Sequence, residues 1–180
     1  MSRLGSVAGF LLGLLLASCA PRAPLDQVVE ARTALDYDIW ANRHLAALSP
    51  TDAADYTRAF HELRIFSVTQ WTGHPPEEQY QHVLDQLHGL KVRAVIAQGL
   101  QCGNQRLGLL LAQDRAALQR KEDIITTPST TEQLTILRQA MEDMTRRIAV
   151  NEEEIRRNEA SIRRVSPGEA PPAAQAKPPI

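Results

Sequence analysis

The sequence predicts an all-α protein, in which a small helical domain is followed by a long C-terminal coiled-coil helix that forms an antiparallel hairpin with the helix before it. Apolar residues recur at helical steps of three and four along most of the chain, and no alternating strand pattern of useful length occurs. Seven of the eight aromatic residues lie between Tyr37 and Tyr80, which places most of the core in the first half. A heptad repeat fills the last long helix.

The first two helices are expected on either side of the pair Ser49-Pro50. The first covers residues 25–48, and its apolar steps of three and four predict one buried face made of Leu25, Val28, Ala31, Leu35 and Ile39. Ser49 is the N-cap of the second helix, and Pro50 suits its first turn. The second helix continues to Trp71 or loosens at residues 67–69, and its buried face holds Ala53, Tyr56, Phe60 and Leu63.

A break at residues 72–76, which contain a glycine and two prolines, separates the second helix from the third. The third helix buries a stripe made of Tyr80, Val83, Leu84 and Leu87, and Gly89 bends it before residues 90–100. Gly99 and Gly103 flank Cys102 and weaken the helix there, each by about 1 kcal/mol relative to alanine. We therefore expect a helical domain at 25–103 and a hairpin or coiled coil at 104–165, whose first helix covers 104–125.

The strongest helical signal lies at residues 129–165. Ser129-x-x-Glu132 is a capping box, and Ser166-Pro167-Gly168 ends the helix. The heptad a positions hold Leu134, Met141, Ile148, Ile155 and Ile162, and the d positions hold Leu137, Met144, Asn151, Asn158 and Val165. A turn at 126–131 would fold this helix back on 104–125. The shorter helix would cover it only to about residue 151, so residues 152–165 would project or pack on the first-half core.

The candidate partner-binding residues come from this uncovered part of the helix and are Asn151, Ile155, Asn158 and Ile162. Asparagines at buried seam positions reduce stability and select the register or the partner. A projecting, half-polar seam would therefore suit the docking of another helix. A parallel coil of two copies is less favoured, because Glu154 would face Glu159 of the second copy.

Near the N-terminus, an apolar run extends from Leu4 to Leu16 and ends in the sequence Leu16-Ala17-Ser18-Cys19. The run is shorter than the roughly 20 residues that a membrane-spanning helix needs. A short basic start, an apolar segment and small residues before the cut indicate a secretory signal. The cysteine after the small residues resembles the lipobox of bacterial lipoproteins. The resemblance implies that Cys19 carries the lipid, that residues 1–18 are removed, and that Ala20 directs the protein to the periplasmic face of the outer membrane. Residues 19–24 are then a lipidated tether.

Lipidation of Cys19 would leave Cys102 without an internal disulfide partner. A buried thiol is the favoured state, with an intermolecular disulfide or a reactive site as alternatives. The five histidines include no pair at the spacing of a helical metal site, and no Cys-x-x-Cys occurs, so we expect no metal. We also predict no catalytic residues and no cofactor. Nearly balanced charge and the absence of a basic face argue against nucleic acid as a partner.

The stretch Asp38-Ile39-Trp40-Ala41, with the lipobox, the heptad helix and the Pro-rich residues 166–180, resembles the QseG-like family of outer-membrane lipoproteins. This resemblance implies contact with the periplasmic sensor region of a two-component histidine kinase and implies no catalytic residues. Residues 166–180 are expected to be disordered. The sequence thus predicts an outer-membrane lipoprotein that acts through protein–protein contacts. A pilotin or assembly lipoprotein that escorts a secretion or surface component, and a structural envelope lipoprotein, remain alternatives.

Overall fold

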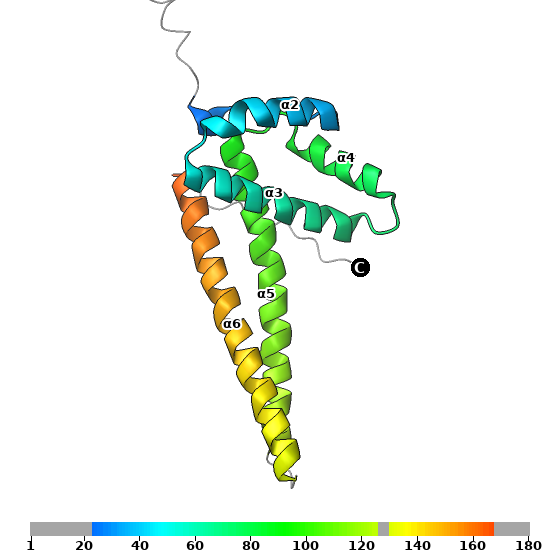
Figure 1. Cartoon of the computed structure of the whole chain (residues 1–180), viewed down its shortest axis with the longest axis vertical. Helices are drawn as coiled ribbons and strands as arrows, with labels where there is room; N and C mark the ends of the chain where they lie inside the picture. Colours follow the sequence, from blue (N-terminus) through cyan, green and yellow to red (C-terminus); the bar gives the residue numbers. More distant parts are fainter. Residues whose placement is uncertain (1–22, 126–129, 168–180) are drawn as a thin grey trace, which may run out of the picture.

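The computed structural model describes residues 23–125 and 130–167, and it confirms the all-α fold and the helical hairpin (Figure 1). The elements in chain order are η2 (Pro24–Asp26), α2 (Ala34–His44), η3 (Leu45–Ala47), α3 (Pro50–Gln70), α4 (Pro76–Leu87), α5 (Val92–Ile125) and α6 (Thr131–Val165). The signal segment, Cys19, Ala20, Ser129 and the tail beyond Pro167 lie outside the described residues. None of the helices in the described part combines the length and apolar character that a membrane span needs.

The molecule has a head and a stalk (Figure 1). Helices α5 and α6 run antiparallel, and α3 crosses α5 near one end of this pair. Helices α2 and α4 lie on the same end, next to α3. We call residues 107–125 and 131–150 the stalk and the other described residues the head. Most of the core lies in the head, as the distribution of aromatic residues predicts.

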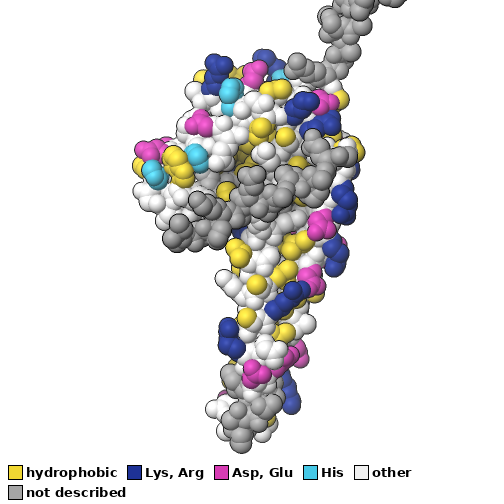
Figure 2. Space-filling model, turned by 180° about the vertical axis from the view of Figure 1, so that it is seen from behind, with side chains coloured by type: hydrophobic (Ala, Val, Ile, Leu, Met, Phe, Trp, Pro, Cys, Tyr) yellow, Lys and Arg dark blue, Asp and Glu magenta, His cyan; other side chains and the backbone are white. Residues whose placement is uncertain are grey.

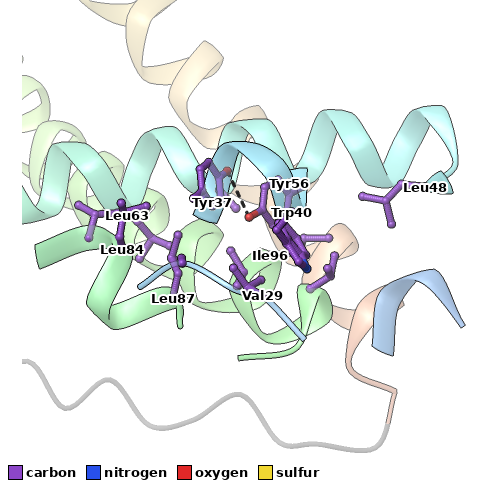
Figure 3. Close-up of a cluster of buried hydrophobic side chains, with 14 of the residues drawn as sticks. Val29, Tyr37, Trp40, Leu48, Tyr56, Leu63, Leu84, Leu87 and Ile96 are labelled. Carbon is purple, nitrogen blue, oxygen red and sulfur yellow. Dashed lines mark hydrogen bonds between the residues drawn. The ribbon is translucent and has the colours of Figure 1, made fainter. Parts of the chain in front are cut away.

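The head core combines aromatic side chains from α2 and α3 with aliphatic side chains from α4 and the first turns of α5 (Figure 3). Tyr37 and Phe60 stack with ring centroids 5.2 Å apart. The hydroxyls of Tyr37 and Tyr56 are 3.3 Å apart and share a hydrogen bond inside this apolar cluster. Burial raises the pKa of both phenols, and their mutual hydrogen bond satisfies polar groups that would otherwise be costly to bury.

The expected helix over residues 25–48 is wrong in its first part, where η2 makes a single 3-10 turn and residues 27–33 are not helical. Val29 donates its backbone N–H to the carbonyl of Leu90 over 2.8 Å, and Gly89 donates to the carbonyl of Val29 over 3.0 Å. An isolated antiparallel bridge joins Val28 to Lys91. These bonds satisfy backbone groups that a helix would have satisfied locally, so the segment is fixed by a turn about 60 residues away in the sequence.

Helix α2 starts only after Thr33, whose side chain caps it by accepting from the N–H of Asp36. Its buried face differs from the expected one. Tyr37 and Trp40 are buried, with 7% and 3% of their surface exposed. Leu35 and Ile39, which we expected inside, are 68% and 50% exposed. The late start shows that Leu25 and Ala31 belong to a different element and that their spacing to Leu35 is not a helical face.

Helix α5 runs without a break from Val92 to Ile125, so the glycines around Cys102 do not interrupt it, and the boundary expected at residue 103 falls inside a helix. The glycines lie where α3 crosses α5. A Cβ atom on Gly99 would sit 2.2 Å from the carbonyl oxygen of Ala59, and one on Gly103 would sit 3.0 Å from Cγ of Glu62. Glycine permits this close approach of two backbones, and the packing gain outweighs its low helix propensity.

The predicted helix starts and buried stripes of α3 and α4 are confirmed. Ser49 accepts from the N–H of Asp52 as the N-cap of α3, and Val83, Leu84 and Leu87 are buried in α4. In α6 the capping box lies one residue later than predicted. Thr130 accepts from the N–H of Gln133, and the Gln133 side chain accepts from the N–H of Thr130.

Candidate interaction surface

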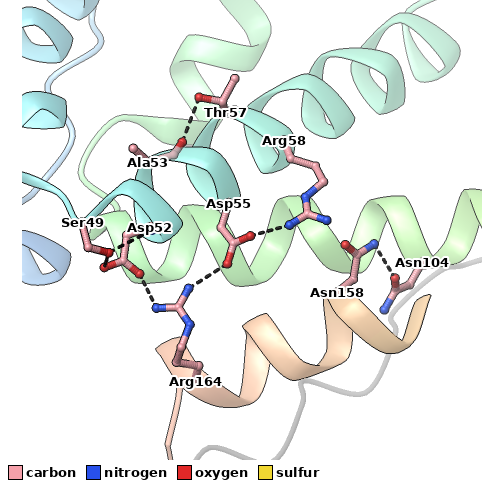
Figure 4. Close-up of polar contacts among 9 residues, drawn as sticks. All are labelled: Ser49, Asp52, Ala53, Asp55, Thr57, Arg58, Asn104, Asn158 and Arg164. Atoms are coloured by element: carbon pink, nitrogen blue, oxygen red, sulfur yellow. Dashed lines mark hydrogen bonds and ion pairs between the residues drawn. The ribbon is translucent and has the colours of Figure 1, made fainter. Parts of the chain in front are cut away.

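The C-terminal end of α6 packs on the head and does not project. Arg164 bonds to Asp55 over 2.7 Å and also to Asp52, and Asp55 bonds in turn to Arg58 (Figure 4). Asp55 is 2% exposed, and Val165 at the end of α6 is 1% exposed. Of the two possibilities for residues 152–165, the structure therefore has the second, in which this segment packs on the first-half core.

The four candidate partner-binding residues line the inside of the hairpin and its junction with the head. Asn158 is 1% exposed, and its Nδ2 donates to Oδ1 of Asn104 over 2.9 Å (Figure 4). Asn151 and Ile155 are half-buried, and Ile162 packs against the head core. The structure thus brings these residues together along one seam, but as part of the internal packing. Asn158 is thus used in the internal packing, whereas Asn151 and Ile155 keep part of their surface exposed, and a docking role for the four residues stays a prediction.

A second buried ion pair joins α3 to α5, and it was not predicted from the sequence. Glu62 is 6% exposed and receives two hydrogen bonds from Arg106, over 2.9 and 2.5 Å. The hydrogen bond from Arg106 to Glu62 is the main reason that the pKa of Arg106 is raised. Asp55, Ala59 and Glu62 follow steps of four and three, so one face of α3 carries buried carboxylates at both ends of its closest contact with α5. The spacing of Asp55 and Glu62 on the face of α3 that holds Ala59 is the sequence signal that predicts these buried carboxylates.

The contact between Asp52 and Arg164 predicts that acid loosens the end of α6. Partial burial raises the pKa of Asp52, but hydrogen bonds from Ser49 and Arg164 outweigh it and lower the pKa below the ordinary 3.8. A carboxyl with a depressed pKa stabilises the fold above its unfolded value, and this stability is lost as the pH falls through the folded value. Chemical unfolding of the wild type and Asp52→Asn between about pH 6 and pH 2 should show a shallower loss of stability in the variant.

At neutral pH we expect Asp52→Asn to reduce the free energy of unfolding by about 1 kcal/mol or less, because Arg164 is partly exposed and retains Asp55. Asp36→Asn, on the exposed side of α2, is the control and should keep the wild-type pH profile. If the free energy of unfolding depends on pH equally in the wild type and in Asp52→Asn, the role of this pair is contradicted.

Cys102 is a half-buried free thiol that packs against the head core. Burial, followed by the negative charge of Glu62, raises the pKa of its thiol. Because the thiolate is the reactive form, we expect Cys102 in the folded protein to react with a disulfide reagent at least about tenfold more slowly than in the unfolded chain. Glu62→Gln should increase the rate in the folded protein, whereas Glu122→Gln on the exposed part of α5 should not. A fast reaction in the folded wild type would favour the alternative of a reactive site.

The stalk covers its own apolar seam incompletely. Among the described stalk side chains, only Leu107 and Leu111 are buried, at 3% and 7% exposed. The other apolar seam residues are half-buried: Leu118, Leu134, Leu137, Met141, Met144 and Ile148. Figure 2 shows hydrophobic side chains along the stalk next to a row of charged ones. Two helices cover only one side of each other, so this seam would be buried more fully by a third helix.

Ion pairs between α5 and α6, exposed apolar side chains and a shallow groove surround this seam. Asp114 pairs with Arg147 over 2.7 Å and Glu152 pairs with Arg115 over 2.6 Å, and both pairs link α5 to α6. Outside the seam, the stalk exposes the large apolar residues Leu109, Leu110, Ile136 and Val150. A shallow groove along α6 is lined by Met141, Thr145 and Ala149 between charged side chains. The stalk therefore presents incompletely covered apolar side chains on a regular helical scaffold.

No group of three or more His, Cys, Asp and Glu side chains in the described ranges is arranged so that it could hold a metal ion. The buried carboxylates of Asp55 and Glu62 are instead held by arginines, and they join helices to each other. Comparisons with protein-family models, with curated proteins and with solved structures find no match for this chain.

Proposed function

We propose that the protein is an outer-membrane lipoprotein, anchored through Cys19 on the periplasmic face, whose stalk binds a helical segment of a partner protein. The half-exposed seam of the stalk carries this proposal. A seam of Leu, Met and Ile that two helices leave open is the surface that a third helix covers in a bundle. We place the proposed contact on residues 107–150, next to the predicted residues 151–162, because Asn158 is buried in the internal packing and Ile162 packs against the head core.

The buried ionisable groups support a binding role over a catalytic one, because they form ion pairs that join helices to each other. Glu62 and Arg106 form a bidentate pair between α3 and α5, and Asp55 is shared by arginines of α3 and α6. These groups are saturated by each other and act as links between helices. The partner that we propose is the periplasmic sensor region of a two-component histidine kinase, on the resemblance of the lipobox, residues 38–41 and the heptad helix to the QseG-like lipoproteins.

Site-specific photo-crosslinking in cells tests the contact. A photoreactive amino acid at Met144, in the half-buried seam, should give an adduct that contains the kinase. The same amino acid at Arg146, whose side chain is 73% exposed two residues further along α6, is the control and should give none. An adduct at Met144 with a secretion or surface component would favour the pilotin or assembly alternative, and an adduct with a second copy of this chain would favour a structural envelope protein. No adduct at Met144 would contradict the stalk as the binding surface.

A further inference from the structure

Helix α2 has two faces of opposite character. Tyr37 and Trp40 are buried in the head core, whereas Leu35 and Ile39 lie one turn apart on the other face and are 68% and 50% exposed. Asn42 continues the direction of Leu35 and Ile39 along the helix, and the charged residues Asp38 and Arg43 flank it and are exposed. The outer face of α2 is thus a short apolar strip with a polar border.

Helix α2 lies close to the start of the described chain, and this position indicates what the apolar strip faces. The start of the described chain, with η2, lies beside α2 at the end of the molecule opposite to where α5 ends and α6 begins (Figure 1). Cys19 precedes Ala23 by four residues, and a fully extended chain of that length reaches at most about 14 Å. The stalk extends away by about 28 Å over residues 107–125 alone. A lipid on Cys19 therefore holds the α2 end of the head close to the bilayer and leaves the stalk away from it.

We infer that the outer face of α2 rests on the bilayer that holds the lipid anchor, with Leu35 and Ile39 entering the interfacial region. This inference deepens the proposed function and rests on its lipid anchor at Cys19. Apolar residues at the centre of a helix face and polar residues at its borders are typical of helices that lie in the membrane interface. Such helices bury their apolar face about 5–10 Å into the boundary between headgroups and acyl chains.

The charges of α2 predict which lipids matter. Asp36, Asp38 and Arg43 are exposed on this helix, so its own charges give no attraction to anionic lipids. Contact must come from the apolar pair and from the high local concentration that a short tether imposes. We therefore expect insertion into phosphatidylcholine vesicles without anionic lipid. The arrangement also sets an orientation, in which α2 lies along the membrane and the stalk points into the periplasm towards its partner.

The full-length lipidated protein in phosphatidylcholine vesicles tests this orientation. An environment-sensitive dye is attached to a cysteine at position 35 in one variant, Leu35→Cys, and at position 109 in the other, Leu109→Cys, both in a Cys102→Ser background. Leu35 and Leu109 have the same exposure, 68%, but the first lies on α2 and the second on the stalk. The dye at position 35 should emit several-fold more strongly than the dye at position 109, and lipids with a nitroxide near the headgroup should quench only the former.

A second pair of variants tests the role of the apolar strip. With the dye at position 35, Ile39→Asp should remove most of the enhanced emission, and Ile136→Asp on the stalk should not. Flotation with the vesicles and the mass of the N-terminal peptide are measured on the same samples. Protein that floats but shows equal emission at the two positions would overturn the contact of α2 and leave the anchor intact. Protein that carries no lipid and does not float would overturn the anchor and this inference with it.

Discussion

Replacing Gly99 by alanine is expected to lower the free energy of unfolding by about 3 kcal/mol, although alanine is the better helix former. The new Cβ atom would lie 2.2 Å from the carbonyl oxygen, 2.5 Å from the carbonyl carbon and 2.6 Å from Cα of Ala59. All three are backbone atoms of α3, so no side-chain rotation can relieve the overlap. Helix α3 would have to move away from α5 and open the head core that both helices share.

The same substitution elsewhere in α5 provides matched controls. A Cβ atom on Gly108 meets nothing within 4 Å, so Gly108→Ala should stabilise the protein by about 0.5–1 kcal/mol. Gly103→Ala should lie between the two, because the nearest atom, at 3.0 Å, belongs to the side chain of Glu62 and not to the backbone of α3. Urea unfolding followed by helical circular dichroism measures all three. Equal changes in the free energy of unfolding for Gly99→Ala and Gly108→Ala would show that α3 and α5 do not approach each other as closely as in the structure.

Replacing Cys19 by serine is expected to abolish lipid attachment completely, since serine has no thiol to receive the diacylglyceryl group. The unmodified chain should keep residues 1–18 and run as a larger precursor. Incorporation of labelled palmitate, the mobility of the chain in a gel and the mass of its N-terminal peptide measure this effect. It is an all-or-none result and the largest that we expect from a single substitution.

Cys102→Ser is the matched control, because it removes the other cysteine of the chain. It should retain the label, the size of the mature chain and its position in the outer-membrane fraction of a density gradient. Label retained by Cys19→Ser, or lost from Cys102→Ser, would contradict the assignment of Cys19 as the lipid carrier.

Helices whose signals are local could be predicted from the sequence. Ser49 and Pro50 start α3, the glycine and prolines of 72–76 separate α3 from α4, and the heptads define α6 almost to the residue. Residues 27–31 could not be predicted in the same way. Their apolar spacing imitates a helix, but their backbone bonds go to residues 89–92, and a pattern within one segment carries no information about such a distant partner.

The candidate surface shows the same division between local and distant information. The heptad places Asn158 and Ile162 on one face of α6, and that face is turned inwards, with Asn158 bonded to Asn104 of α5 and Ile162 packed against the head core. It does not predict that Arg164 reaches Asp52 and Asp55, because this contact depends on where α3 is placed by the head core. Once the end of α6 is fixed there, Asn158 is covered and Ile162 packs against the head core.

The backbone bonds between residues 27–29 and 89–92 also determine how mechanical tension would pass through the molecule. Asp26 adds ion pairs to Lys91 and Arg93 at the same place. A pull between the start of the described chain and the stalk would therefore cross directly from residues 26–29 to the first turn of α5 and continue along that helix. Helices α2, α3 and α4 lie outside this load path, so the head core can remain folded under such a pull.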